Sequence, residues 1–334
     1  MAGFAALSAL PALGQDANAP VWYAWSPKPN VLPPYGRNKP VTRLPDLLSK
    51  HKGQKNWTEQ VILTPRYNAR WISAAPGMKV PTQYYADDRV VWVVWGGQIR
   101  FTIDGQQPFV ATKGFLVQVP QRVRYSMETI GDEPSLRFEV THTGINPAFP
   151  GDAPKPANPP GEHYMKISQP TRPDTYDAIN RPYVDFFKDV VAADPTHGPK
   201  QSRVVSDEAN LVNIIRGQGV PTPPDSNRGH FHLGHDEFWF ILEGKCDYLI
   251  EDVGLLTADA GDIVFVPPGR FHRASWANGQ MDTRLSLEND CSKPPEGSRR
   301  VPVRAVETAG NRKPTADAGS LDIRGSFSDS IALS

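Results

Sequence analysis

Residues 230–237, His-Phe-His-Leu-Gly-His-Asp-Glu, decide how this chain folds and which chemistry it can support. Side chains two positions apart on a strand point the same way, so His230 and His232 share one face of a predicted strand. Glu237 opens the next apolar strand, and His272 follows 35 residues after it. If these strands belong to one barrel, three imidazoles and one carboxylate meet in its mouth. This set of nitrogen and oxygen ligands, without a thiolate, suits Fe, Mn, Ni, Cu or Zn.

Strand patterns surround this stretch and fall into two groups. Apolar runs or alternations typical of strands occupy residues 90–95, 99–103, 115–119 and 136–140, and then 211–215, 238–242, 248–250, 263–266 and 285–287. The groups repeat each other, because Gly96 matches Gly244 at an offset of 148 residues and Gly114-x5-Pro120 matches Gly261-x5-Pro267 at an offset of 147. We therefore predict an all-β fold built from two tandem copies of one small antiparallel barrel.

The second copy resembles the cupin superfamily at both of that family's motifs. The motifs read His230-x-His232-x4-Glu237-x6-Gly244 and Gly261-x5-Pro267-x-Gly269-x2-His272. Pro224 and Trp276 stand where the family has a glycine and an asparagine. The resemblance implies a bicupin, that is, two tandem double-stranded β-helix (jelly-roll) barrels with a few short helices and extended arms. It also implies that the three histidines and Glu237 hold one divalent transition metal.

The first copy keeps the glycine and proline frame of these motifs but not their ligands. Gln83, Tyr85, Arg89 and Tyr125 occupy the corresponding positions. An arginine adds positive charge where a cation would lie, so we predict that the first barrel is free of metal. Packing, dimerisation or covering of the other barrel are the roles expected for it.

Three further residues near the predicted centre are candidates for a catalytic role. His235 is an alternative ligand, a neighbour of the ligands or a solvent-facing loop residue. Trp239 should face the barrel interior as core or as a stacking surface for a substrate. Arg270, two residues before His272, either points inward to hold an anionic substrate or lies on the solvent-exposed rim. The aromatic residues expected to line the site are Phe231, Trp239, Phe240, Phe271 and Trp276.

Composition restricts the class of function. Among 334 residues, 36 are Lys or Arg and 36 are Asp or Glu, so the formal net charge is zero. That balance argues against a nucleic-acid partner and against electrostatic attraction to membranes. Hydrophobic residues make up 39% of the chain, which is enough for a sizeable core, while 34 prolines disfavour long helices.

The predicted organisation has six segments. They are a signal peptide over 1–19, an extended N-terminal arm over 20–59, the first barrel over 60–143, a proline-rich linker with one helix over 144–204, the second barrel over 205–291 and a tail over 292–334. Within these segments we expect a short helix over 44–51, a hairpin turn at Asp104-Gly105 and the linker helix within 174–194.

The first residues bear on the compartment. The small, apolar residues 2–13 resemble the core of a secretory signal, although no Lys or Arg precedes Lys28. Export would place the mature protein in the periplasm or outside the cell, where a disulfide between Cys246 and Cys291 becomes feasible. No other stretch approaches the ~20 apolar residues of a membrane span, so we expect no membrane insertion of the mature chain. The arms suggest a homodimer.

The leading functional hypothesis is a metal-dependent oxygenase of the dioxygenase type that acts on a small aromatic or oxygen-rich substrate. This hypothesis favours Fe or Cu among the candidate metals. Two alternatives stay open: a redox-neutral decarboxylase, lyase or isomerase in which Arg270 holds a carboxylate, and a non-enzymatic exported protein that binds a metal or a small ligand. The fold alone does not choose among them.

Overall fold

The structure is a computed structural model that describes residues 31–153, 155–158, 160–161, 163–167, 172–194, 200–207, 210–218, 229–277 and 279–288. The predicted signal peptide, the predicted C-terminal tail, Pro224 and Cys291 lie outside these residues, and the expectations about them stay predictions. No helix in the described part of the chain has the length and apolar character needed to cross a bilayer.

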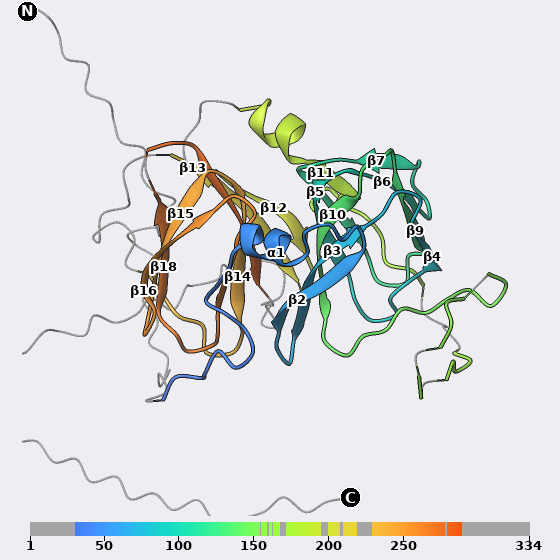
Figure 1. The fold of residues 1–334 in the computed structure, drawn as a ribbon, viewed down its shortest axis with the longest axis horizontal. Helices are drawn as coiled ribbons and strands as arrows, with labels where there is room; N and C mark the ends of the chain where they lie inside the picture. Colours follow the sequence, from blue (N-terminus) through green and yellow to red (C-terminus); the bar gives the residue numbers. More distant parts are fainter. Residues whose placement is uncertain are drawn as a thin grey trace, which may run out of the picture.

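Each half of the chain folds into two antiparallel sheets. The first half consists of β2 (Trp57–Leu63), β3 (Tyr67–Ala74), β4 (Lys79–Gln83), β5 (Val90–Gly96), β6 (Gln98–Ile103), β7 (Phe109–Ala111), β8 (Phe115–Val119), β9 (Tyr125–Ile130) and β10 (Ser135–His142). The second half consists of β12 (Lys200–Ser206), β13 (Leu211–Gly217), β14 (Glu237–Glu243), β15 (Lys245–Ile250), β16 (Gly254–Asp259), β17 (Ile263–Val266), β18 (His272–Trp276) and β19 (Asp282–Glu288). The two halves stand side by side in Figure 1, blue to green for the first and yellow to orange for the second. The predicted all-β architecture of two tandem cupin-like barrels is confirmed.

Each half also contributes a leading strand and helix to its neighbour. The first half begins with β1 (Val41–Thr42) and α1 (Leu44–Lys50), and the second with β11 (Tyr183–Asp185) and the π-helix η1 (Phe186–Val191). Strand β1 pairs with β17 of the second half, and β11 pairs with β8 of the first half. The sheet orders are therefore β1-β17-β14-β19-β13-β12 with β16-β15-β18, and β11-β8-β5-β10-β3-β2 with β4-β9-β6-β7. This exchange of strands ties the two halves together.

The register of the sheets fixes how the two halves correspond. Gly97 and Gly244 directly follow the equivalent strands β5 and β14, with φ of 66° and 68°, and Gly114 and Gly261 precede the equivalent strands β8 and β17, with φ of 92° and 95°. Both pairs are 147 residues apart, so the partner of Gly244 is Gly97 and not the predicted Gly96. Glycine is required here because positive φ strains any residue that carries a Cβ.

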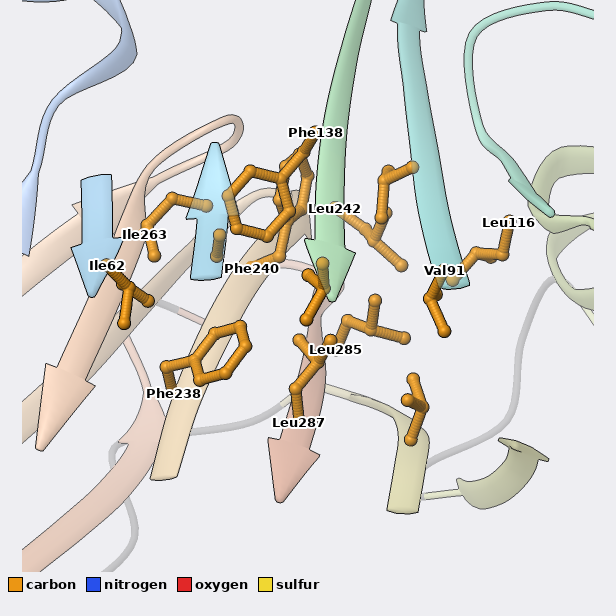
Figure 2. Close-up of a cluster of buried hydrophobic side chains, with 14 of the residues drawn as sticks. Ile62, Val91, Leu116, Phe138, Phe238, Phe240, Leu242, Ile263, Leu285 and Leu287 are labelled. Atoms are coloured by element: carbon orange, nitrogen blue, oxygen red, sulfur yellow. The ribbon is translucent and has the colours of Figure 1, made fainter. Parts of the chain in front are cut away.

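The largest core lies between the halves. The inward strands of the two six-stranded sheets contribute side chains such as Trp71, Phe138, Phe238, Phe240 and Leu285, each 0% exposed. Figure 2 shows Phe138 and Phe240 among the aliphatic side chains that fill this contact. A separate apolar cluster fills the interior of each half.

Local predictions outside the strands hold in part. The helix expected over 44–51 is α1, and the turn expected at Asp104-Gly105 closes β6, with the amide of Gln106 donating to the carbonyl of Ile103 at 3.0 Å. The helix expected within 174–194 is η1, whose N-cap Asp185 accepts from the Lys188 amide. The structure begins the first-half strands at Trp57 and extends the second half back to β12, so the segments called arm and linker contain strands of both halves.

Candidate metal centre

Four side chains of the second half converge on one point. The ligand atoms of His230, His232, Glu237 and His272 all lie within 4.8 Å of one another, and they form the one group of three or more such residues found within the described ranges. The Nε2 atoms of His232 and His272 lie 3.0 and 2.9 Å from Oε2 of Glu237, and the Nε2 atoms of His230 and His232 are 3.1 Å apart. The sequence spacing predicted this convergence.

Backbone hydrogen bonds between separate segments bring these four residues together. His230 and His272 form an isolated antiparallel bridge in which each amide donates to the other's carbonyl, at 2.9 and 2.8 Å. The carbonyl of His232 accepts from the amide of Gly269 at 2.5 Å, which links the histidine segment to the turn before β18. Glu237 begins β14 opposite Val266.

Hydrogen bonds on the far side of the ligands fix their orientation. Nδ1 of His272 donates to the carbonyl of Arg270 at 3.0 Å, so the neutral ring presents the lone pair of Nε2 to the centre. Oε1 of Glu237 accepts from the hydroxyl of Ser286 at 2.9 Å, which leaves Oε2 directed at the imidazoles. Sequence reasoning missed Ser286, although its place between Leu285 and Leu287 in an alternating strand would have indicated an inward side chain.

The protonation states favour a cation at this point. Burial raises the pKa of Glu237, but contacts with the three imidazoles outweigh burial and hold the pKa well below its usual range. Burial lowers the pKa of His272 below 6.5, despite the opposing effect of Glu237. At neutral pH the centre therefore collects a carboxylate and at least one neutral imidazole whose acceptor atoms face each other.

The donor set fits a divalent transition metal. Two ligand atoms that each lie about 2.1 Å from an ion and subtend a right angle are about 3.0 Å apart. The separations of 2.9 to 3.1 Å among His230, His232, Glu237 and His272 match that value, while His230 and Glu237 are 3.7 Å apart. The side chains of Glu237 and His272 are buried, whereas that of His230 is 42% exposed. The centre is thus closed toward the barrel interior and reachable on the His230 side.

Two of the other candidate residues lie beside the centre. The ring of His235 packs against His232, with centroids 4.2 Å apart, and its nitrogens are not among the converging ligand atoms. Trp239 is 2% exposed and meets the ring of His272 edge to face at 5.3 Å. Trp239 also contacts Tyr248 at 5.0 Å, so it forms part of the barrel core and one wall beside the ligand.

Arg270 points away from the centre. Its Nη1 donates to the carbonyl of Glu251 at 2.8 Å, and its Nη2 donates to the carbonyl of Pro33 at 2.9 Å. The guanidinium also lies over the ring of Tyr35, 4.9 Å from its centroid. The structure thus assigns Arg270 to holding the N-terminal arm, which corrects the expectation that it holds an anionic substrate. Its direction depends on an arm more than 200 residues away, which no local pattern reveals.

The predicted aromatic lining is also revised. Phe240 faces the core between the halves, where it contacts Trp71 and Phe138. Trp276 stacks on Arg284 within the second half, and its exposed fraction is 8%. Phe231 and Phe271 remain half-buried beside the ligand segments.

The first half has a different set of residues at the equivalent point. Nε2 of Gln83 donates to the hydroxyl of Tyr125 at 2.7 Å. Burial, together with the nearby carboxylate of Glu139, raises the pKa of Tyr85. Val90 occupies the register of Glu237, because Val90 pairs with Val119 as Glu237 pairs with Val266. The ligand positions therefore carry glutamine, tyrosine, valine and tyrosine.

Arg89, which the sequence aligned with Glu237, lies one residue before that position and turns away from the interior of the first half. Its guanidinium donates to Asp207 at 2.5 Å and to Asp174 at 3.2 Å, and it also contacts Gln118. With 2% of its side chain exposed, Arg89 connects the first half to segments that follow it in the chain.

Comparison with known proteins agrees with this architecture. Residues 221–287 match the sequence profile of the family described as "Cupin domain". A search of curated protein sequences found no match. Among solved structures, the chain resembles a Cupin 2 conserved barrel domain protein from Leptotrichia buccalis, with a TM-score of 0.51, 12% identity and coverage of 75% of this chain and 96% of that one. It also resembles the salicylate 1,2-dioxygenase from Pseudoaminobacter salicylatoxidans, with a TM-score of 0.53, 13% identity and coverage of 75% and 80%.

At these identities the structural likeness establishes the fold. The segment that contains the four converging residues, 221–287, matches the cupin domain family.

Proposed function

We propose that the protein is a metal-dependent oxygenase of the dioxygenase type that acts on a small aromatic or oxygen-rich molecule, with its single metal in the second half. The observation that carries the proposal is the convergence of three histidines and Glu237 within 4.8 Å. The first half, with Gln83, Tyr85, Val90 and Tyr125 at the equivalent positions, has no comparable ligand set, which supports a single centre.

When bound by these residues, a redox-active metal such as Fe or Cu would supply activation of O2 beside a bound substrate. The chain's own residues hold and orient that centre. Arg270 fixes the tautomer of His272 through its backbone carbonyl, and Ser286 orients the carboxylate of Glu237. The indole of Trp239 covers the buried side of His272, which keeps water from that face.

Access to the centre supports a small substrate. His230 and His232 expose 42% and 21% of their side chains, whereas Glu237 exposes 5%. A substrate would therefore approach past the two histidines, with half-buried Phe231 and Phe271 close to this path. Aromatic walls favour a flat, apolar substrate body.

The redox-neutral alternative has lost its specific support. It relied on Arg270 to hold a substrate carboxylate, and that guanidinium is bonded to the backbone of the arm and of Glu251. The non-enzymatic alternative rests on the missing ligand set of the first half, which fits the proposed enzyme equally well. Both remain as outcomes of the test below.

Oxygen consumption tests the proposal directly. Protein reconstituted with Fe(II) or Cu(II) would be placed in an oxygen electrode with catechol, gentisate, salicylate and a flavonol in turn. We expect uptake with at least one substrate that His232→Ala abolishes and His235→Ala retains, because only the former removes a ligand. Uptake equal to that of His232→Ala for every substrate contradicts the proposal. Product formation without oxygen uptake would indicate redox-neutral chemistry, and tight metal binding without turnover would indicate a binding protein.

A further inference from the structure

The two halves place an arginine at the same point of their interiors but surround it differently. Arg137 on β10 and Arg284 on β19 are equivalent, because Arg137 pairs with Ile72 and Arg284 pairs with Ile215. Each arginine lies two positions before a residue that faces the interior of its half, which is Glu139 in the first half and Ser286 in the second. In the second half the indole of Trp276 covers Arg284, with 4.6 Å between the guanidinium carbon and the ring centroid.

The covering indole has no counterpart in the first half. Trp276 pairs with Cys246, and the equivalent pair is Thr129 with Ile99. The indole also packs directly on Gly217, where an added Cβ would lie 2.6 Å from a ring carbon. The residue equivalent to Gly217 is Ala74, since Ala74 pairs with Ser135 as Gly217 pairs with Asp282. The first half therefore has a small side chain where the second half has an aromatic ring.

A cavity of about 360 Å³ occupies this place in the first half. It opens between β2 and β4, the edge strands of the two sheets. The lining is mainly apolar, and Arg137 contributes to it; the walls include Trp57, Ile72, Val80, Ile99, Met127 and Thr129. Its size lies within the range of small-molecule sites, which is roughly 300–1,000 Å³.

Arg137 brings an uncompensated positive charge to this cavity. It is 6% exposed, and its buried Nε has no hydrogen-bond partner. The carboxylate of Glu139 interacts electrostatically with Arg137, but its Oε1 accepts from Nε and Nη2 of Arg70 at 2.8 and 2.6 Å, and its Oε2 accepts from the indole of Trp92 at 2.7 Å. Two guanidiniums thus share one carboxylate whose oxygens are already bonded.

The other ionisable residue near the cavity does not neutralise the charge of Arg137. Lys79 is the other ionisable residue of the lining, and its ammonium group lies 3.5 Å from Glu128 at the surface. No aspartate or glutamate belongs to the lining. A buried cation in a lining without carboxylates favours an anionic partner that can accept hydrogen bonds.

We propose that this cavity is a binding site for a small aromatic carboxylate. The carboxylate group bonds to Arg137, and the ring fills the apolar volume that the indole of Trp276 fills in the second half. The site lies in the half without the metal ligands, so it is separate from the proposed reaction centre and does not depend on the proposed function.

Binding of 4-fluorobenzoate, followed by fluorine NMR, tests the proposal on the full-length protein. We expect saturable broadening and a shift of the fluorine signal, and binding at least about tenfold weaker for the neutral 4-fluorobenzamide, because it lacks the charge-assisted bond. Arg137→Met should weaken 4-fluorobenzoate binding by about the same factor. His232→Ala, which removes a metal ligand in the other half, should leave that binding unchanged.

A variant that fills the cavity makes the test independent of Arg137. The double substitution Ala74→Gly with Thr129→Trp copies the arrangement of Gly217 and Trp276, and it should abolish 4-fluorobenzoate binding while the single substitution Ala74→Gly retains it. Circular dichroism would confirm that each variant is folded. Absence of binding to the wild type at millimolar ligand, equal binding to the filled variant, or loss of binding in His232→Ala would each overturn the proposal.

Discussion

The backbone of Arg270 holds a metal ligand while its side chain holds the N-terminal arm. The carbonyl of Arg270 accepts from Nδ1 of His272 at 3.0 Å, and its guanidinium donates to the carbonyl of Pro33 at 2.9 Å. The arm is further attached by β1 and by the amide of Phe265, which donates to the carbonyl of Pro40 at 3.0 Å. One residue therefore connects the position of the arm with the orientation of His272.

Replacement of this arginine should destabilise the fold. Arg270→Met removes two hydrogen bonds from a residue that is 5% exposed and leaves the carbonyls of Glu251 and Pro33 without that donor. We expect a loss of about 2–4 kcal/mol in the free energy of unfolding, measured by urea denaturation. Arg100→Met serves as a control, because Arg100 is half exposed and pairs with Glu128 at the surface, and should change stability by less than about 1 kcal/mol. Equal effects of the two substitutions would contradict the role assigned to Arg270.

Metal content should distinguish the ligands from their neighbours. His232→Ala removes a converging nitrogen and should weaken metal binding by at least about 100-fold, whereas Ser286→Ala removes only the bond to Glu237 and should weaken it about tenfold. His235→Ala should retain the wild-type stoichiometry, because its ring packs on His232 without joining the ligand atoms. Elemental analysis after reconstitution and dialysis measures all three. Loss of metal in His235→Ala alone would show that the ligand assignment is wrong.

Stability should also depend on pH through a pair distant from the metal centre. Nδ1 of His142 lies 3.0 Å from Oδ1 of Asp88, whose side chain is fully buried, and this hydrogen bond raises the pKa of His142 above 6.5. The folded protein therefore keeps a proton that the unfolded chain releases near pH 6.5. The stabilisation is fully present below that pH and is lost as the pH rises through the raised pKa of the folded state.

Comparison of the wild type with His142→Gln isolates this contribution. Urea denaturation at a series of pH values from about 5.5 to 8.5 should show the difference in unfolding free energy between the two proteins shrinking as the pH rises. Other titrating groups affect both proteins alike and cancel in the difference. A difference that is constant over this range, or that grows with pH, would contradict the assignment.

The candidate site was predictable because short sequence patterns determine where its residues lie. Period-two spacing placed His230 and His232 on one face, and the glycine and proline repeat placed His272 opposite them. The same repeat predicted two copies of one fold. Its one-residue error, Gly96 in place of Gly97, carried over to Arg89, which was aligned with Glu237 although Val90 is the residue in that register.

Non-local pairing accounts for what the sequence did not reveal. The exchange of β1 and β11 joins residues that are far apart in the chain, and the direction of Arg270 follows from that exchange. Phe240 was assigned to the wrong face because all residues from Phe238 to Leu242 are buried, so no polar alternation marks the two sides of β14. A strand covered on both faces has no amphipathic signal.

The same covered strand makes the core between the halves a sensitive point. Phe240 contacts Trp71, Trp95 and Phe138, with ring centroids 5.4 to 5.5 Å apart. Phe240→Ala should therefore destabilise the protein by about 3–5 kcal/mol through lost burial and a cavity. Because this core belongs to both halves and the strand exchange connects them, intrinsic fluorescence and far-UV circular dichroism should report one coincident unfolding transition in the wild type. Leu255→Ala is the matched control, since Leu255 is 70% exposed and should change stability by less than about 0.5 kcal/mol. Separate transitions in the wild type, or a small effect of Phe240→Ala, would show that the halves are stable without their shared core.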